Sequence, residues 1–175
     1  ASFWGVTMAR SWVVALACVA ALAPRSGSAA EDEVTAKARV HLRAGIAEGY
    51  RQAGEALLET GVTAYLPTFI TSPEEQLLAA LREVPSGGDG PRVLGAHLEG
   101  PFLSALRLGI HSADARRNPD VDLLDRLLDA GPVRLVTLAP ELPGATKVIE
   151  RLLQREIVIS CGHSDANAEQ ANAAF

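Results

Sequence analysis

The sequence predicts an α/β fold in which parallel strands alternate with helices, and three observations support this prediction. Four short apolar segments with strand preferences alternate with segments of helical periodicity; these strands are residues 62–66, 93–99, 133–138 and 157–160. The connections are short, which requires right-handed βαβ crossovers and a parallel sheet. The strands are continuously apolar rather than alternating, so we expect helices to cover the sheet on both faces.

Two architectures fit this alternation: an open doubly wound sheet, or part of an eight-stranded α/β barrel. A Gly-rich phosphate loop would favour the first, but neither G-x-G-x-x-G nor a Walker pattern is present. Instead, each strand ends in its own polar or proline-containing signature, and barrels typically build one site from several strand ends. The four signatures are Leu66-Pro67-Thr68, Leu98-Glu99-Gly100-Pro101, Ala139-Pro140-Glu141 and Gly162-His163-Ser164. We therefore predict part of a TIM-type (β/α)8 barrel, with about four strands present.

Composition places the chain among globular proteins. Of its 175 residues, 48% are hydrophobic and 21% are charged, which suffices for one domain with a substantial core. The net charge of −5 and the lack of a long basic run argue against a nucleic-acid-binding surface. Cys18 and Cys161 are far apart and form no CxxC pair, which argues against a thiolate zinc site or a disulfide framework.

Residues 1–45 differ from the rest of the chain. The apolar run Ser11–Ala23 follows Arg10 and resembles a secretory signal, and it is too short to span a bilayer. Seven residues precede Met8, however, whereas a signal peptide begins at its initiator. A segment foreign to the domain and an ordinary buried helix are the alternatives. We place residues 1–45 outside the barrel, which then covers residues 46–175.

The elements before the central strand have clear start and stop signals. Residues 46–60 carry apolar side chains on one helical face, and Gly61 is a good C-terminal stop. Pro67 is expected to close the strand that follows, because proline cannot donate to a sheet ladder. Ser72 is expected to cap a second helix, with Pro73 at its first position.

The elements after the central strand are equally regular. Gly100-Pro101 ends that strand, and residues 102–119 are too polar and irregular for one element. We predict a long loop here, and such loops in compact domains usually carry function. Helices are predicted at residues 120–130, at residues 144–154 and from about residue 165.

Four side chains at or near the strand ends are candidates for chemistry: Glu99, His111, Glu141 and His163. A carboxylate together with imidazoles suits zinc or iron(II). His97 shares a strand face with Glu99, because side chains alternate along a strand; core packing and a role behind the site are both open for it. A hydrogen-bonded loop histidine is an equally good interpretation of His163 taken alone.

Two of the polar side chains have simpler structural interpretations. For Glu141, capping of the next helix or pairing with Lys147 or Arg134 is favoured over catalysis. Ser164 has no visible base beside it and is expected to cap the last helix.

Five motifs occur in the order and spacing of one protein family. They are GVTAYLPT at 61–68, HLEGPF at 97–102, Gly-Ile-His at 109–111, VTLAPE at 136–141 and GHSDA at 162–166. Over roughly residues 48–175 the chain resembles the N-acetylglucosamine-6-phosphate deacetylases of the metal-dependent amidohydrolase superfamily. The resemblance implies a (β/α)8 barrel in a cytoplasmic enzyme of amino-sugar catabolism. Its implied reaction is hydrolysis of the acetamide of N-acetylglucosamine 6-phosphate to glucosamine 6-phosphate and acetate.

The resemblance also implies site residues. Glu99 and His163 match ligands of a divalent metal, zinc or iron, whereas Ile110 and His111 match a substrate-contacting Gly-Ala-His step, with Ile where Ala is usual. No catalytic residue is expected within the chain, because the family's catalytic Asp is expected beyond Phe175. A third metal-binding His, in a Thr-His-x-Phe-Asn-Ala-Met motif, is also expected there. The chain thus resembles a central fragment, and we expect it to hydrolyse the substrate poorly by itself.

Partners and alternatives follow from the same resemblance. The implied partner is a small-molecule amino-sugar phosphate, without nucleic acid or membrane, and a homo-oligomer is one candidate state of the full-length protein. Another amidohydrolase acting on a different amide is the first alternative. A non-catalytic exported α/β fragment is the second, since the signal-like segment leaves export open.

Overall fold

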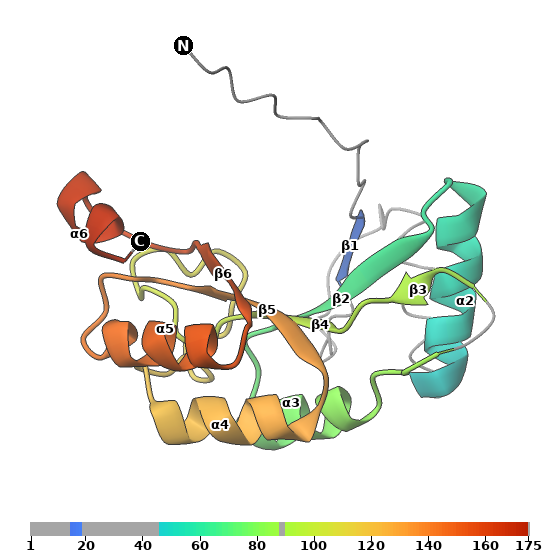
Figure 1. Ribbon diagram of the computed structural model, residues 1–175, viewed down its shortest axis with the longest axis horizontal. Helices are drawn as coiled ribbons and strands as arrows, with labels where there is room; N and C mark the ends of the chain where they lie inside the picture. The colour runs from blue at the N-terminus through green and yellow to red at the C-terminus, as the bar shows by residue number, and fades with distance from the viewer. Residues whose placement is uncertain (1–14, 19–45, 88–89, 175) are drawn as a thin grey trace, which may run out of the picture.

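The computed structural model describes residues 15–18, 46–87 and 90–174, and its centre is a sheet of parallel strands (Figure 1). The sheet has six strands in the order β1-β2-β4-β5-β6, with the short β3 also paired to β2. Every pairing is parallel, which confirms the predicted βαβ connectivity. The strands are β1 Ala15–Cys18, β2 Ala64–Ile70, β3 Arg92–Val93, β4 Ala96–Glu99, β5 Val133–Leu138 and β6 Val158–Cys161.

Five helices accompany the sheet in the described part of the chain: α2 Ile46–Glu59, α3 Glu74–Arg82, α4 Val121–Ala130, α5 Ala145–Gln154 and α6 Ala168–Ala173. Figure 1 shows α3, α4 and α5 side by side along one side of the strands, with α2 beside β2 and β3. None of these helices is both long enough and apolar enough to cross a membrane.

The main core lies between the strands and helices α3, α4 and α5. Each of these helices turns one apolar face to the sheet, as the periodicity predicts. A fully buried leucine contributes about 1.5–3 kcal/mol of hydrophobic free energy, and several lie in this layer. The buried side chains include Phe69, Leu98, Val136 and Leu138 from the strands and Leu77, Leu81, Leu124, Leu127, Val148 and Leu152 from the helices.

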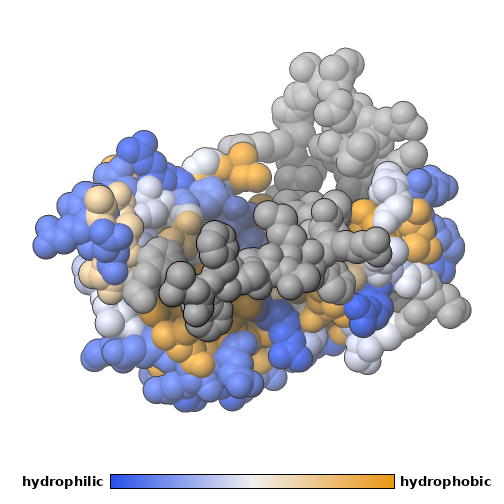
Figure 2. Space-filling model, turned by 45° about the horizontal axis from the view of Figure 1, so that its top comes forward, coloured by the Kyte–Doolittle hydropathy of each residue, from blue (hydrophilic) through white to orange (hydrophobic). Residues whose placement is uncertain are grey.

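The outer sides of these helices are joined by ion pairs. Arg126 of α4 donates to Glu74 of α3, and Arg155, which follows α5, pairs with Asp129 of α4. Exposed pairs of this kind contribute about 0–1 kcal/mol each, so burial rather than charge holds this layer together. Figure 2 shows one face of the molecule, on which hydrophobic residues gather between rims of hydrophilic ones.

The first predicted strand is longer than expected and runs through Pro67. The prediction that Pro67 ends the strand is wrong, because β2 continues to Ile70. Along one edge, β2 pairs with β3 at residues 64–65 and with β4 at residues 68–70. Pro67 lies between these two paired stretches, so its missing N–H removes no hydrogen bond to β3 or β4.

The predicted central strand is divided into β3 and β4. Gly95 lies at the break with φ +129°, and a Cβ there would lie 2.4 Å from the carbonyl oxygen of Pro132. Leu94 donates to Tyr65 of β2, whereas Ala96 donates to Pro132, the residue just before β5. The chain therefore changes partners at a glycine, which a pattern of apolar residues does not reveal.

Two predicted helix caps are also wrong. Ser72 donates to the carbonyl of Ile70, and Pro73 occupies the N-cap of α3 without a side-chain hydrogen bond. Ser164 does not cap the last helix. That helix begins at Ala168 rather than near residue 165, because Asn167 and Gln170 form a capping box.

Residues 100–120 form the predicted long loop between β4 and α4. Phe102 and Leu103 are fully buried, and backbone hydrogen bonds fix the loop to its surroundings: Ala139 donates to Phe102, and Ser104 donates to His163. The loop is therefore packed against the carboxyl ends of the strands.

Little of the signal-like segment is described. Residues 1–14 and 19–45 lie outside the described residues, whereas Ala15–Cys18 form β1 and pair with β2. A boundary near residue 45 and the nature of the segment before it stay predictions.

Candidate metal centre

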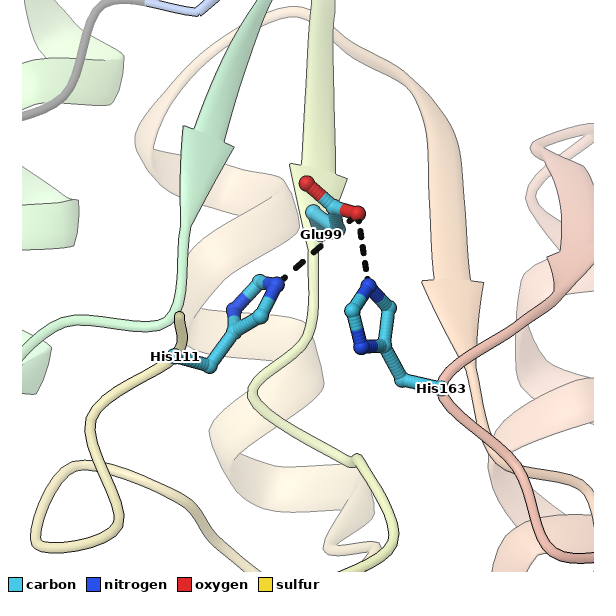
Figure 3. Close-up of side chains that lie close together, drawn as sticks. All are labelled: Glu99, His111 and His163. Carbon is cyan, nitrogen blue, oxygen red and sulfur yellow. Dashed lines mark hydrogen bonds and ion pairs between the residues drawn. The ribbon is translucent and has the colours of Figure 1, made fainter. Parts of the chain in front are cut away.

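Three of the four candidate side chains converge at the carboxyl-end edge of the sheet (Figure 3). Glu99 is the last residue of β4, His111 lies in the loop that follows, and His163 lies just after β6. Nε2 of His163 is 2.9 Å from Oε1 of Glu99, and Nε2 of His111 is 3.8 Å from the same oxygen. One ligand atom from each residue lies within 4.8 Å of the other two. The cluster unites positions up to 64 residues apart in sequence.

Glu99 is fixed by the turn that follows it. Gly100 has φ +90°, and a Cβ there would lie 2.2 Å from Oγ1 of Thr71. This close approach lets Oγ1 of Thr71 donate to the backbone carbonyl of Glu99 across 3.1 Å. The glycine is thus required by both its conformation and its neighbour.

His163 is oriented by the loop that packs against it. Its Nδ1 lies 2.8 Å from the carbonyl oxygen of Arg107, and because a carbonyl only accepts, Nδ1 must donate. In the neutral ring Nε2 is then left with a lone pair directed at Glu99. The backbone of His163 has φ +51°, which costs a non-glycine residue about 1–3 kcal/mol. Such strain is typical of functional positions.

His111 is oriented by Thr71. Its Nδ1 lies 3.0 Å from Oγ1 of Thr71. The backbone N–H of Thr71 donates to the same Nδ1 across 3.3 Å, and because a backbone N–H can only donate, Nδ1 must accept. In the neutral ring the proton therefore lies on Nε2, which faces Oε1 of Glu99 at 3.8 Å.

Burial keeps the His111 ring neutral. Burial lowers the pKa of His111 below its ordinary value of 6.5, and the neighbouring His163 acts in the same direction against the opposing effect of Glu99. A neutral imidazole is the form that binds metals.

The donor set fits a metal ion. Nε2 of each histidine faces one carboxylate, and the closest contact, 2.9 Å between Nε2 of His163 and Oε1 of Glu99, is satisfied by a proton between the two atoms or by a cation bound to both. Glu and His are the ligand types that zinc and iron(II) accept, and Nδ1 of His163 donates to a backbone carbonyl, as metal-binding histidines usually do. The described residues therefore form a possible metal site.

A clamp between two loops lies over this cluster. The guanidinium of Arg107 donates through Nε to Oδ1 of Asp165 across 2.8 Å, and the backbone of Arg107 holds His163. The clamp thus joins the long loop to the segment after β6.

Glu141 and Ser164 lie apart from the cluster and bind each other. Oγ of Ser164 donates to Glu141 across 2.6 Å, and the backbone N–H of Asp165 donates to the other carboxylate oxygen across 2.7 Å. The predicted pairing of Glu141 with Lys147 or Arg134 is therefore wrong, and so is the predicted capping by Ser164. Burial tends to raise the pKa of Glu141, but these hydrogen bonds outweigh it and lower that pKa below its usual 4.5.

His97 lies deeper in the sheet. It is buried, and its ring nitrogens contact Oγ1 of Thr68 at 3.0 Å and Oγ1 of Thr137 at 2.8 Å. These residues lie on the two strands that flank β4, so the ring bridges three strands. Burial lowers the pKa of His97 against the opposing charge of Glu99. Both nitrogens are engaged, which supports the core-packing interpretation.

Sequence reasoning counted His111 among the four candidate side chains, and the family resemblance gave it and Ile110 a substrate-contacting role. Ile110, predicted with it as a substrate contact, is 84% exposed, whereas the His111 side chain is 1% exposed. The residues that orient the two imidazoles, Thr71 and Arg107, are 40 and 56 residues away from them, and no motif spacing marks such contacts. The roles assigned to individual site residues stay predictions.

Comparison with known proteins extends these observations. No protein-family model matches the chain. It is 39% identical over 133 residues to the N-acetylglucosamine-6-phosphate deacetylase of Homo sapiens, covering 72% of this chain and 32% of that protein. It is 37% identical over 121 residues to the N-acetylgalactosamine-6-phosphate deacetylase of Escherichia coli O157:H7, covering 66% of this chain and 32% of that protein.

Two solved structures show the same relationship. The N-acetyl-D-glucosamine-6-phosphate deacetylase of Mycobacterium smegmatis has a TM-score of 0.58 and 38% identity, covering 64% of this chain and 33% of that one. The N-acetylglucosamine-6-phosphate deacetylase of Thermotoga maritima has a TM-score of 0.63 and 32% identity, covering 71% of this chain and 34% of that one. This likeness confirms the predicted part of a TIM-type (β/α)8 barrel. The chain is similar to N-acetylglucosamine-6-phosphate deacetylases over about two thirds of its own length, and it spans about a third of the length of the curated relatives it matches.

Proposed function

We propose that residues 46–175 form the metal-binding part of an enzyme that hydrolyses the acetamide of N-acetylglucosamine 6-phosphate to glucosamine 6-phosphate and acetate. The observation that carries the proposal is the convergence of Glu99, His111 and His163 at the carboxyl ends of parallel strands. This edge is where barrel enzymes place their chemistry. The substrate follows from the relatives, of which those of human, mouse and zebrafish are named for this reaction.

In this proposal Glu99 and His163 hold a divalent metal, zinc or iron. When bound, such a metal polarises an amide carbonyl and lowers the pKa of coordinated water to about 7. The chain's own contribution is to fix the ligands. Thr71 and Gly100 set the position of Glu99, and the carbonyl of Arg107 sets the ring of His163.

No general base is assigned among the described residues. Glu99 is the one carboxylate in the cluster, and Glu141 is turned away to Ser164 and Asp165. The described part of the chain therefore supplies metal binding and shape. A positioned group that accepts a proton is typically worth about 10²–10⁴ in rate, and the family resemblance assigns that role to an Asp outside this chain.

N-acetylgalactosamine 6-phosphate is a second candidate substrate. The relative from Escherichia coli O157:H7 is named for it and is 37% identical, close to the 39% of the human relative. The two sugars differ in configuration at one hydroxyl group, so the pocket around that hydroxyl must choose between them. The broader alternative is an amidohydrolase with a different amide substrate.

The test is a chimera in which the matched segment of this chain replaces the aligned segment of the human relative. We expect it to release acetate from N-acetylglucosamine 6-phosphate, and more slowly from the galactosamine epimer or the unphosphorylated sugar. Glu99→Gln in the chimera should reduce this release more than about 100-fold, since loss of a metal ligand exceeds loss of its supporting contacts. The exposed Glu150→Gln is the matched control and should leave it unchanged. A folded, zinc-containing chimera that releases acetate from none of these sugars would refute the proposal.

Two further family expectations accompany the proposal: a cytoplasmic location and self-association. Both are expectations that follow from the family resemblance. Fractionation of the source cells tests the first, and light scattering on the purified protein tests the second.

A further inference from the structure

We propose that His97 is a positioning residue, whose ring fixes the register between β4 and β5 and thereby places the end of β4. His97 does not belong to the cluster of possible metal ligands, so it acts through the strands that flank it. The claim about the register is independent of any metal. Its consequence for metal binding by Glu99 rests on the proposed function.

The pairing of β4 with β5 is irregular directly before His97. Ala96 is the partner of Val133, but His97 is the partner of Leu135, so Arg134 has no partner on β4. An extra residue of this kind disrupts the ladder locally and often re-aims a side chain. The pairs that precede the irregularity therefore do not by themselves determine the register of the pairs that follow it.

The ring of His97 bridges the three strands just beyond this irregularity. Its Nδ1 lies 3.0 Å from Oγ1 of Thr68 on β2, and its Nε2 lies 2.8 Å from Oγ1 of Thr137 on β5. His97 is 4% exposed and Thr68 is 0% exposed. Because solvent cannot replace a lost partner at such buried atoms, any arrangement that breaks the bridge is costly.

The bridge selects one register among those that the apolar pattern allows. A shift of β5 by one residue would turn its buried side chains to the wrong face, and burial alone excludes it. A shift by two residues would keep every side chain on its face. It would, however, bring Leu135 or Ala139 to the ring in place of Thr137, and neither side chain can form a hydrogen bond. Thr137 is the only residue of β5 with a hydroxyl group, so the ring distinguishes the observed register from these alternatives.

Thr137 transmits this constraint to Glu99. Glu99 is the register partner of Thr137. The Thr137 side chain contacts His97, two residues before Glu99, and the Thr137 carbonyl accepts a hydrogen bond from the N–H of Gly100 across 3.0 Å. Glu99 is therefore held between two attachments to a single residue of β5, and the hydroxyl of Thr71 holds its carbonyl from the other side.

The hydrogen bonds also assign the ring proton. A neutral imidazole donates from one nitrogen and accepts at the other, and a hydroxyl that accepts must give its own proton to a further acceptor. Oγ1 of Thr68 has no second partner among the described residues and no exposed surface, whereas Thr137 is 7% exposed. Thr68 therefore donates to Nδ1, and Nε2 of His97 carries the ring proton and donates it to Thr137.

The first experiment observes the ring in the unsubstituted protein, so it does not depend on the folding of a variant. The chain has four histidines, which are labelled with ¹⁵N and assigned through the backbone by nuclear magnetic resonance. We expect a single tautomer of His97, with a proton on Nε2 that exchanges slowly with water. Ring signals that average between the two tautomers would show that the ring is not held and would overturn the inference.

The second experiment tests the register and needs no metal. His97→Phe keeps a ring in place but cannot bond to either threonine, and Thr137→Val removes one bond at nearly constant shape. The matched control is Val148→Ala, which removes buried methyl groups from α5 and leaves the bridge intact.

In this experiment the exchange of the Gly100 N–H is compared at equal overall stability, which urea adjusts. We expect it to exchange at least about 10-fold faster in both bridge variants than in the control, because the Thr137 carbonyl that holds it is displaced. Equal exchange at Gly100 in the bridge variants and the control would overturn the inference.

The third experiment measures zinc affinity by competition with a chromogenic chelator. We expect His97→Phe to weaken binding by about 10-fold, as loss of a residue that orients a metal ligand does. Val148→Ala should change it less than about 3-fold, and so should His97→Gln, whose amide offers a donor and an acceptor to the two threonines.

Zinc binding that is weakened equally in His97→Phe and Val148→Ala would overturn the positioning role. A native protein that binds no zinc would refute the proposed function instead, while the exchange at Gly100 would still decide the register. Circular dichroism verifies that each variant is folded.

Discussion

The backbone carbonyl of Arg107 accepts a hydrogen bond from Nδ1 of His163 across 2.8 Å, while the side chain of Arg107 pairs with Asp165. One residue of the long loop thus fixes a candidate metal ligand and is itself fixed by the segment that follows that ligand. The ion pair is largely exposed, with side-chain exposures of 60% and 37%, so its own contribution to stability is about 0–1 kcal/mol. Its importance lies in positioning.

The first prediction concerns this clamp. Asp165→Asn should weaken zinc binding about 10-fold, because the Arg107 carbonyl is held less firmly and the His163 ring loses its fixed orientation. The melting temperature should change little, as expected for an exposed ion pair. Asp129→Asn is the control, because it removes a pair with Arg155 on the helical layer and should leave zinc affinity unchanged. Equal affinities in the two variants would show that the clamp does not support the site.

The second prediction concerns Gly100. Gly100→Ala should lower the free energy of unfolding by about 2 kcal/mol or more, because a Cβ would meet Oγ1 of Thr71 at 2.2 Å and φ is +90°. The displaced Thr71 would also release its hydrogen bonds to Glu99 and His111, so zinc affinity should fall as well. Gly87→Ala is the control, since nothing lies within 4 Å of a Cβ there, and urea unfolding should place it within about 0.5 kcal/mol of the native chain. A Gly100→Ala protein as stable as the Gly87→Ala protein would contradict the geometry.

The third prediction concerns pH and Glu141. The pKa of Glu141 in the folded protein lies below its usual 4.5, so folding favours the ionised carboxylate. Its stabilising contribution is therefore fully present above about pH 4.5 and is lost as the pH falls through the lowered pKa. Glu141→Gln should cost about 1–2 kcal/mol at pH 7, where Ser164 and Asp165 donate to the carboxylate. Urea unfolding at pH 7 and at about pH 3 measures this cost, which should shrink at the lower pH. A cost that is the same at both values would disprove the assignment.

The fold was largely predictable because its signals are local. Apolar strands, helical periodicity and the Gly100-Pro101 break each lie within a few residues, and the structure confirms the parallel alternation. The errors occur where the backbone at one residue depends on a contact with residues far away in the sequence. Pro67 continues its strand because the neighbouring chain is interrupted beside it, and Gly95 divides a strand because Pro132 and Arg134 lie against it.

The candidate site was predictable in part. Glu99 and His163 stood out because they lie at the ends of two strands, Glu99 as the last residue of one and His163 just after the other. The place of His111 depends on Thr71, 40 residues earlier in the chain, and on the path of a loop without regular structure. Such contacts have no spacing rule, which is why the sequence pointed to His111 as a candidate without revealing its neighbours.

The central claim is that Glu99 and His163 hold a metal ion at this edge of the sheet. Metal analysis of the purified protein after dialysis against metal-free buffer tests this claim most directly. We predict about one equivalent of zinc or iron per chain in the native protein and almost none in Glu99→Gln, whose amide cannot supply a negatively charged ligand. Equal metal content in the native protein and in a folded Glu99→Gln variant would contradict the account.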